Sequence, residues 1–200
     1  MAERKVTPNQ TIGPFFHYAL TGRSYGVSEI ATNDLTAAVN GADEHRIRIV
    51  GRLTDGAGTP VDDALVELWQ ANPAGRYAHR EDLQDKPLTE GFFGFGRCAT
   101  AQGGSFSFTT LKPGRVPGRG NALQAPHVLL GVFARGILKR VVTRLYFADE
   151  AQANAEDPVL ESVDRARRPT LIAAREDGDI PVYRFEIRLQ GDGETVFFDV

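Results

Sequence analysis

HVLLGVFA at residues 127–134 and VVTRLYF at residues 141–147 are two apolar runs separated by a short linking segment. The first run is continuous and has the length of a strand, which is typical of a strand in the middle of a sheet. The link begins with Arg135 and Gly136, where a turn is expected. We therefore expect the two runs to pair with each other near the centre of a β-sheet.

Other segments alternate between apolar and polar residues, which is the period of a half-buried strand. They are RIRIVGRLT (46–54), ALVELWQ (64–70), SFSFTTL (105–111) and VYRFEIRLQGDGETVFF (182–198). The sequence DGAG at residues 55–58 reads as a hairpin turn, and GDG at residues 191–193 predicts that the last segment is a two-stranded hairpin. In residues 64–70 apolar side chains fall on both faces, so we expect burial on both sides, with Trp69 in the core.

The remaining segments are predicted loops and helices. The 21 glycines and 11 prolines are spread between short apolar runs, as expected for many turns between short strands. Residues 71–98 and 112–126 are rich in Gly and Pro, and we expect long loops there, which in compact domains usually carry function. Residues 149–177 are dense in Ala and charged residues, and Pro158 suits a first helical turn, so one or two short helices are expected near residues 156–175.

These patterns together predict an all-β fold. Seven or so strands at this spacing favour a β-sandwich over a barrel. Residues 1–45 show no helical period, and we expect an extended N-terminal arm followed by an irregular segment. Residues 46–200 are predicted to form the β-sandwich domain.

Composition excludes several classes of protein. The chain has 200 residues, a net charge of -3 and a pI of about 5.8, so it lacks the basic surface that nucleic acid attracts. No apolar run approaches the roughly 20 residues of a membrane helix, and MAERKVTPNQ has no apolar core of a secretory signal. The single cysteine, Cys98, excludes an intrachain disulfide and a Cys-rich metal site. A cytoplasmic location is the simplest expectation.

Known catalytic motifs are absent from the residue pattern. The four histidines, His17, His45, His79 and His127, form neither a His-x-His pair nor a His-Glu-x-x-His motif. The chain also lacks a Gly-x-Ser-x-Gly nucleophile elbow, a phosphate-binding loop and a dinucleotide fingerprint. The residues taken alone therefore show no self-sufficient catalytic set.

Several segments resemble a known family. They are TPNQTIGPFF (7–16), ALVELWQAN (64–72), GRY (75–77), APH (125–127), FARG (133–136), TRLYF (143–147) and GDGETVFF (191–198). In this order they resemble the subunits of the intradiol ring-cleaving dioxygenases that act on protocatechuate, over nearly the whole chain. The ending is especially similar to the α chains of that family.

The resemblance implies a metal and a partner. In this family a non-haem Fe(III) is bound by the homologous β chain, through two tyrosines and two histidines. Ferric iron is a hard ion that prefers anionic oxygen, so two phenolates suit it. The resemblance thus implies that this chain needs an iron-bearing β chain and that the αβ unit repeats in a larger symmetric assembly.

The four family ligand positions map onto this sequence one at a time. Tyr77 matches the first tyrosine, and Val116 stands at the second. His127 matches the first histidine, and Leu129 stands at the second. Because Val and Leu offer no lone pair, the mapping implies that this chain has vestigial positions and no metal site of its own, and that it holds no catalytic residue.

The resemblance also assigns residues that contact substrate. Thr11, Gly13 and Pro14 in the N-terminal arm match the segment that borders the β chain's iron pocket. Arg135 is also assigned to that pocket, where a guanidinium suits the carboxylate of protocatechuate.

The implied function is that of the α subunit in O2-dependent intradiol cleavage of protocatechuate to 3-carboxy-cis,cis-muconate, within aromatic catabolism through the β-ketoadipate pathway. One alternative is a non-catalytic β-sandwich scaffold or binding subunit that retained the dioxygenase fold. Another is an independent single-chain dioxygenase with altered metal ligands, which Val116 and Leu129 argue against.

Overall fold

The pairing expected for the two apolar runs is present. The computed structural model describes residues 20–22, 26, 28, 31–120 and 122–200. In it, β7 (His127–Phe133) runs antiparallel to β8 (Val141–Phe147), with His127 opposite Tyr146 and Val132 opposite Val141. The two strands lie in the middle of the larger sheet, as the sequence predicts.

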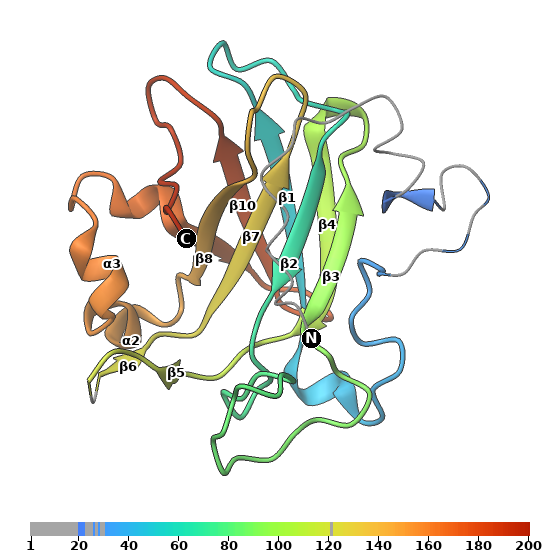
Figure 1. Cartoon of the computed structure of the whole chain (residues 1–200), viewed down its shortest axis with the longest axis vertical. Coiled ribbons are helices and arrows are strands. Elements are labelled where there is room, and N and C mark those ends of the chain that lie inside the picture. The colour runs from blue at the N-terminus through green and yellow to red at the C-terminus, as the bar shows by residue number, and fades with distance from the viewer. Residues whose placement is uncertain (1–19, 23–25, 27, 29–30, 121) are drawn as a thin grey trace, which may run out of the picture.

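Eight strands form one continuous sheet in the order β3-β2-β7-β8-β9-β10-β1-β4. The other six strands are β1 (Arg46–Thr54), β2 (Leu65–Trp69), β3 (Phe95–Ala99), β4 (Ser105–Leu111), β9 (Ile172–Glu176) and β10 (Val182–Arg188). β9 pairs parallel with β8 and antiparallel with β10, so it links two layers (Figure 1). The end strands β3 and β4 also contact each other, so the sheet nearly closes on itself. The predicted all-β sandwich is confirmed.

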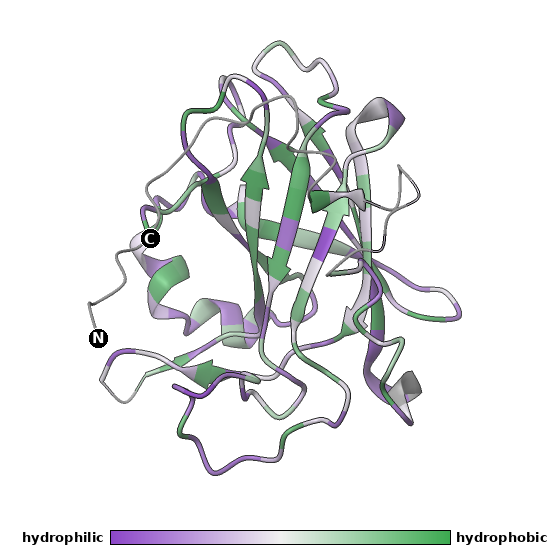
Figure 2. Ribbon diagram, turned by 45° about the vertical axis from the view of Figure 1, so that its right-hand side comes forward, coloured by the Kyte–Doolittle hydropathy of each residue, from purple (hydrophilic) through white to green (hydrophobic). Residues whose placement is uncertain are grey.

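The core lies between the two layers and follows the predicted alternation. In Figure 2 the hydrophobic stretches of the ribbon are concentrated on the strands. From one layer, Ile49, Phe108 and Ile187 are fully buried, and from the other, Val66 and Leu130. Burial of this apolar surface is the main stabilising term for such a fold.

Glycine is required at one point of this core. The Phe106 ring lies directly over Gly51, and a Cβ atom at residue 51 would overlap that ring.

In β2, Leu65 points to the face opposite Val66 and is fully buried as well, so the predicted burial on both faces of this strand is confirmed.

Short helices follow β8, as expected. They are α2 (Ala151–Ala155), α3 (Pro158–Ser162) and the 3-10 helix η4 (Arg168–Leu171). Another 3-10 helix, η2 (Ala42–His45), comes earlier in the chain, just before β1. Pro158 occupies the first turn of α3, and the Asp157 carboxylate accepts hydrogen bonds from the backbone N–H of Val159 and Leu160. An acceptor at this position satisfies N–H groups that a helix start leaves unpaired. These helices bury Leu160 and Leu171 against Tyr146 in a second, smaller core.

Three segments that were predicted to be loops or helices contain strands that the sequence did not predict. β3 begins inside the predicted loop at residues 71–98 and ends at Ala99, and β9 lies inside residues 149–177, where helices were expected. The short strands β5 (Val116–Pro117) and β6 (Leu123–Gln124) pair inside residues 112–126. β3 is an end strand with the sequence FGRCA, and β9 reads IAARE, so neither shows a clear alternation of apolar and polar residues.

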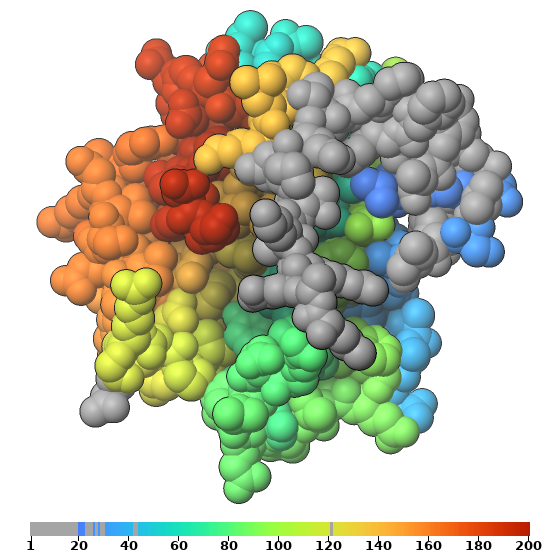
Figure 3. Space-filling model, viewed as in Figure 1, coloured from blue at the N-terminus to red at the C-terminus, as the bar shows by residue number. Residues whose placement is uncertain are grey.

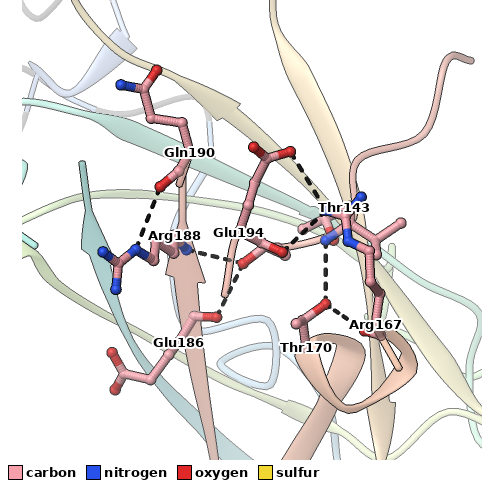
Figure 4. Close-up of polar contacts among 9 residues, drawn as sticks. Thr143, Arg167, Thr170, Glu186, Arg188, Gln190 and Glu194 are labelled. Carbon is pink, nitrogen blue, oxygen red and sulfur yellow. Dashed lines mark hydrogen bonds and ion pairs between the residues drawn. The ribbon is translucent and has the colours of Figure 1, made fainter. Parts of the chain in front are cut away.

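The predicted C-terminal hairpin is wrong. β10 pairs with β1 on one side and, through Val182–Arg184, with β9 on the other. Of the residues after the turn, Thr195 hydrogen-bonds to β10, at Arg188 and Glu186, and among the described residues no second strand pairs with it there. Residues after the Gly191–Gly193 turn instead cross toward β8, where the Thr143 hydroxyl donates to the Val196 carbonyl at 2.7 Å and the Phe198 N–H donates to the Val142 carbonyl. Figure 4 shows the polar contacts that anchor this segment between β10, β8 and η4.

The turn at residues 55–58 behaves similarly. It closes a local bridge between Thr54 and Pro60 but does not pair β1 with β2, because β1 is flanked by β10 and β4. The following strand therefore joins the other layer.

The boundary predicted at residue 45 stays a prediction, and Leu35 on its N-terminal side packs into the main core. In the part of the chain that the structure describes, no helix has the length and apolar character needed to span a bilayer.

Candidate functional site

A cavity of about 660 Å³ lies where β7 begins. Three parts of the chain line it: the ends of the central strands, the loop at residues 77–84, and the β5–β6 ribbon. Figure 3 shows the loop and the ribbon, in green and yellow, on the lower part of one face. The predicted functional loop and the predicted central strands therefore meet at one place.

Three of the four ligand-equivalent positions line this cavity, and the fourth lies beside it. Tyr77, Val116 and His127 line it. Leu129 lies in β7, where it pairs with Trp69 of β2 on one side and with Arg144 of β8 on the other. Trp69 and Arg144 both line the cavity. Because residues directly opposite each other on neighbouring strands point to the same face of a sheet, Leu129 lies on the face that carries the cavity.

His127 is a buried, neutral imidazole. Its Nδ1 lies 2.8 Å from the carbonyl oxygen of Ala125. A carbonyl only accepts hydrogen bonds, so Nδ1 carries the proton and Nε2 keeps its lone pair. Burial, reinforced by the positive charge of Arg144, lowers the pKa of His127 to about 4. The ring is therefore uncharged at neutral pH.

Tyr77 is held by its ring and its backbone. The ring stacks on Trp69 with centroids 5.6 Å apart and planes 16° from parallel, and the backbone N–H donates to Asp82 Oδ2 at 2.8 Å. Burial raises the pKa of the Tyr77 phenol, so it stays protonated at neutral pH. The prediction that Trp69 belongs to the core is wrong in part, since its side chain is half-buried and forms a cavity wall.

A polar network beneath the cavity escaped the sequence analysis. Arg144 Nη1 donates to Gln124 Oε1 at 2.6 Å and to the Tyr146 hydroxyl at 3.3 Å. That hydroxyl donates to Asp157 Oδ1 at 3.1 Å, and burial raises the pKa of Tyr146. Asp157 is fully buried and also accepts from the Ala125 N–H at 2.7 Å. The sequence does offer one sign of this network, the arginine in the central apolar segment TRLYF, because a charged residue in such a segment needs polar partners.

The donor set of this cavity does not fit a ferric site of the family type. Val116 and Leu129 carry no donor atom. Within the described ranges, no group of three or more His, Cys, Asp or Glu side chains is placed to hold a metal ion. From the four mapped positions a hard trivalent ion would find two donors at most, the Tyr77 oxygen and the His127 imidazole, in place of four.

Arg135 lies away from this cavity. It follows the other end of β7, roughly 20 Å along the strand from His127. Its side chain is 75% exposed, and Nη1 lies 3.0 Å from Asp63 Oδ2. Thr11, Gly13 and Pro14 lie outside the described residues. The structure therefore does not bring the expected substrate contacts to the cavity of the same chain.

Comparison with known proteins agrees with this geometry. A family model described as Dioxygenase matches residues 20–191. The chain is 44% identical to the protocatechuate 3,4-dioxygenase alpha chain of Burkholderia cepacia, with 100% of both chains covered. It is 38% identical to the beta chain from the same organism, over 86% of this chain and 77% of that one.

The fold has solved counterparts as well. The dioxygenase domain of a carbohydrate-binding fusion protein from Streptomyces sp. SirexAA-E superimposes with a TM-score of 0.59, at 23% identity, over 94% of this chain and 99% of that domain. Because the family model and the full-length relative both exceed chance similarity by a wide margin, the chain belongs to the intradiol ring-cleaving dioxygenase family.

Proposed function

We propose that the chain is the α subunit of a protocatechuate 3,4-dioxygenase. The observation that carries this proposal is the match to an alpha chain along the entire length, at higher identity than the match to the corresponding beta chain. The reaction of the assembled enzyme is the cleavage of protocatechuate between its two hydroxyl-bearing carbons, with both atoms of O2 entering the product, 3-carboxy-cis,cis-muconate. The enzyme would serve aromatic catabolism through the β-ketoadipate pathway.

In this proposal the Fe(III) belongs to the partner β chain. Two apolar side chains at the mapped ligand positions, Val116 and Leu129, support this proposal, because they replace two donors with groups that bind no metal. Iron chemistry is then supplied by the β chain, and this chain contributes binding surface.

The contribution of this chain centres on Arg135. An exposed guanidinium can reach across a subunit contact, and its ion pair with Asp63 fixes its direction without burying it. We assign it to the carboxylate of protocatechuate, which a planar fork of N–H groups can bind with two hydrogen bonds. Thr11, Gly13 and Pro14 of the arm are proposed to border the same pocket.

The test is co-expression with a homologous β chain. We expect the two chains to purify together and to consume one O2 per protocatechuate in an oxygen-electrode assay. The β chain expressed alone is the matched control and should show much lower activity. A complex that forms but consumes no O2 would favour the scaffold function, and separate migration of the two chains would contradict the proposal.

A further inference from the structure

In the part of the chain that the structure describes, Arg144 is a positive charge without an acidic partner in direct contact. Its contacts are with neutral groups: the amide oxygen of Gln124, the hydroxyl of Tyr146 and, at 5.8 Å, the ring of Phe198. Among the residues that the structure describes, no carboxylate forms an ion pair with it. A half-buried charge whose direct contacts are all neutral gains from an anion that binds it directly.

The carboxylates near Arg144 are engaged elsewhere. Asp157 receives hydrogen bonds from three backbone N–H groups and from the Tyr146 hydroxyl. Asp82 is bound by the backbone N–H of Tyr77 and by Gln84, and Glu81 pairs with Arg80 in solvent. The wall of the cavity formed by β8 is therefore positive, while the acidic groups of the facing loop are bound within that loop.

The free donors of Arg144 have the geometry that a carboxylate needs. Both hydrogen bonds of its guanidinium use Nη1. Nη2 and Nε have no acceptor among the described residues, and their N–H groups form one side of the planar fork. Such a fork binds the two oxygens of a carboxylate together.

The rest of the cavity is suited to a planar ring. Trp69 and Tyr77 stack to form one wall, and the His79 ring meets Trp69 edge-on with centroids 6.3 Å apart. Val116 adds an apolar surface. A volume of about 660 Å³ accommodates a small ligand, and aromatic rings stack on such walls.

We propose that this cavity is a metal-free binding site for a planar aromatic monocarboxylate, with the carboxylate on Arg144 and the ring against the wall of Trp69 and Tyr77. The site belongs entirely to this chain. It does not depend on the proposed ring-cleaving function, because the chain's own residues supply both the charge and the ring wall.

Isothermal titration calorimetry with benzoate tests the proposal on the full chain in complex with its partner. Benzoate has the carboxylate and the ring but no adjacent hydroxyl pair to chelate iron. We expect one binding event per copy of this chain that is independent of Arg135, and this event should be at least tenfold weaker in Arg144→Gln. The matched control is Arg119→Gln, which removes an exposed arginine and should bind benzoate like the unsubstituted protein.

Two comparisons keep the result interpretable. Arg135→Gln removes the carboxylate contact proposed for the substrate pocket, so it should still show the binding event that Arg144→Gln weakens. A pattern in which Arg135→Gln loses that event and Arg144→Gln keeps it would place benzoate elsewhere and overturn the proposal. In the unsubstituted protein, neutral benzamide and non-aromatic cyclohexanecarboxylate should each bind at least tenfold more weakly than benzoate. Equal binding of either compound would overturn the proposed chemistry, whether or not Arg144→Gln folds.

Discussion

Leu129 stands two residues after His127 in β7, and side chains at this spacing point to the same face of a strand. The cavity-lining face of β7 thus presents one imidazole and one isobutyl group. Leu129 pairs across the sheet with Arg144, so a cationic residue neighbours the position where a second histidine would face a metal. A positive charge beside this position would further disfavour a trivalent cation. The face where β7 and β8 lie side by side, which would build a metal site, therefore presents a positive group that attracts an anion.

Asp157 is predicted to be the most sensitive polar residue of the fold. Asp157→Ala removes a helix cap and leaves buried donors unpaired, so we expect it to lower the free energy of unfolding by about 3 kcal/mol. Urea titration measures the change. Asp164→Ala is the matched control, because among the described residues this exposed carboxylate accepts only the Ala166 N–H. The substitution should therefore cost less than about 1 kcal/mol. Equal effects of the two substitutions would contradict the role assigned to Asp157.

His127 predicts a pH dependence of stability. Its pKa in the folded chain is about 4, against an ordinary value of 6.5. Below pH 6.5 the unfolded chain therefore binds a proton that the folded chain does not. The free energy of unfolding should fall as the pH drops from about 6.5 to about 4, by about 3 kcal/mol from this residue.

Urea titrations of the unsubstituted protein and His127→Leu across this range measure the contribution. The curve of the variant should be flatter by that amount. His79→Leu, which removes an exposed histidine, should keep the original slope. A slope unchanged by His127→Leu would show that the imidazole is accessible to protons in the folded chain.

Arg135→Ala should raise the KM for protocatechuate about tenfold in the αβ complex, because a charge-assisted contact to the substrate carboxylate is lost. The iron content should not change, since Arg135 contacts Asp63 and no metal donor. Steady-state oxygen uptake and metal analysis check both points. Arg165→Ala removes another exposed arginine and serves as the control. Unchanged kinetics in Arg135→Ala would remove this residue from the pocket.

Deletion of residues 1–14 should reduce kcat/KM at least about tenfold, because the arm is proposed to position substrate. The urea midpoint of the domain should change little. Deletion of residues 1–6 spares TPNQTIGPFF and provides the control, with activity close to that of the full chain. Full activity after the longer deletion would show that the arm does not border the site.

Alternation and apolar runs predicted the strands β1, β2, β4, β7, β8 and β10. A strand buried on one face alternates between apolar and polar residues, and a strand buried on both faces is a continuous apolar run, so both kinds can be recognised in the sequence. The short end strand β3 and the linking strand β9 were missed, because neighbours and not periodicity hold them in place. The prediction of a C-terminal hairpin was wrong for a tertiary reason, since a turn signal does not reveal that the segment after the turn hydrogen-bonds to β8.

The candidate site likewise has features that the sequence predicted and features that only the tertiary structure reveals. Resemblance mapped Tyr77, Val116, His127 and Leu129, and the structure places the first three in the lining of one cavity and Leu129 beside it. The contact from Gln124 to Arg144 spans 20 residues, and Asp157 reaches Ala125 across 32 residues. Such pairs depend on the finished tertiary structure, so no local pattern in the sequence predicts them.

The iron content of this chain, purified without its partner and loaded with Fe(III), tests the central claim most directly. The account predicts far less than one iron per chain, no visible tyrosinate absorption and no ring cleavage, with iron and activity appearing in the αβ complex. One tightly bound Fe(III) per isolated chain, together with oxygen uptake on protocatechuate, would contradict it.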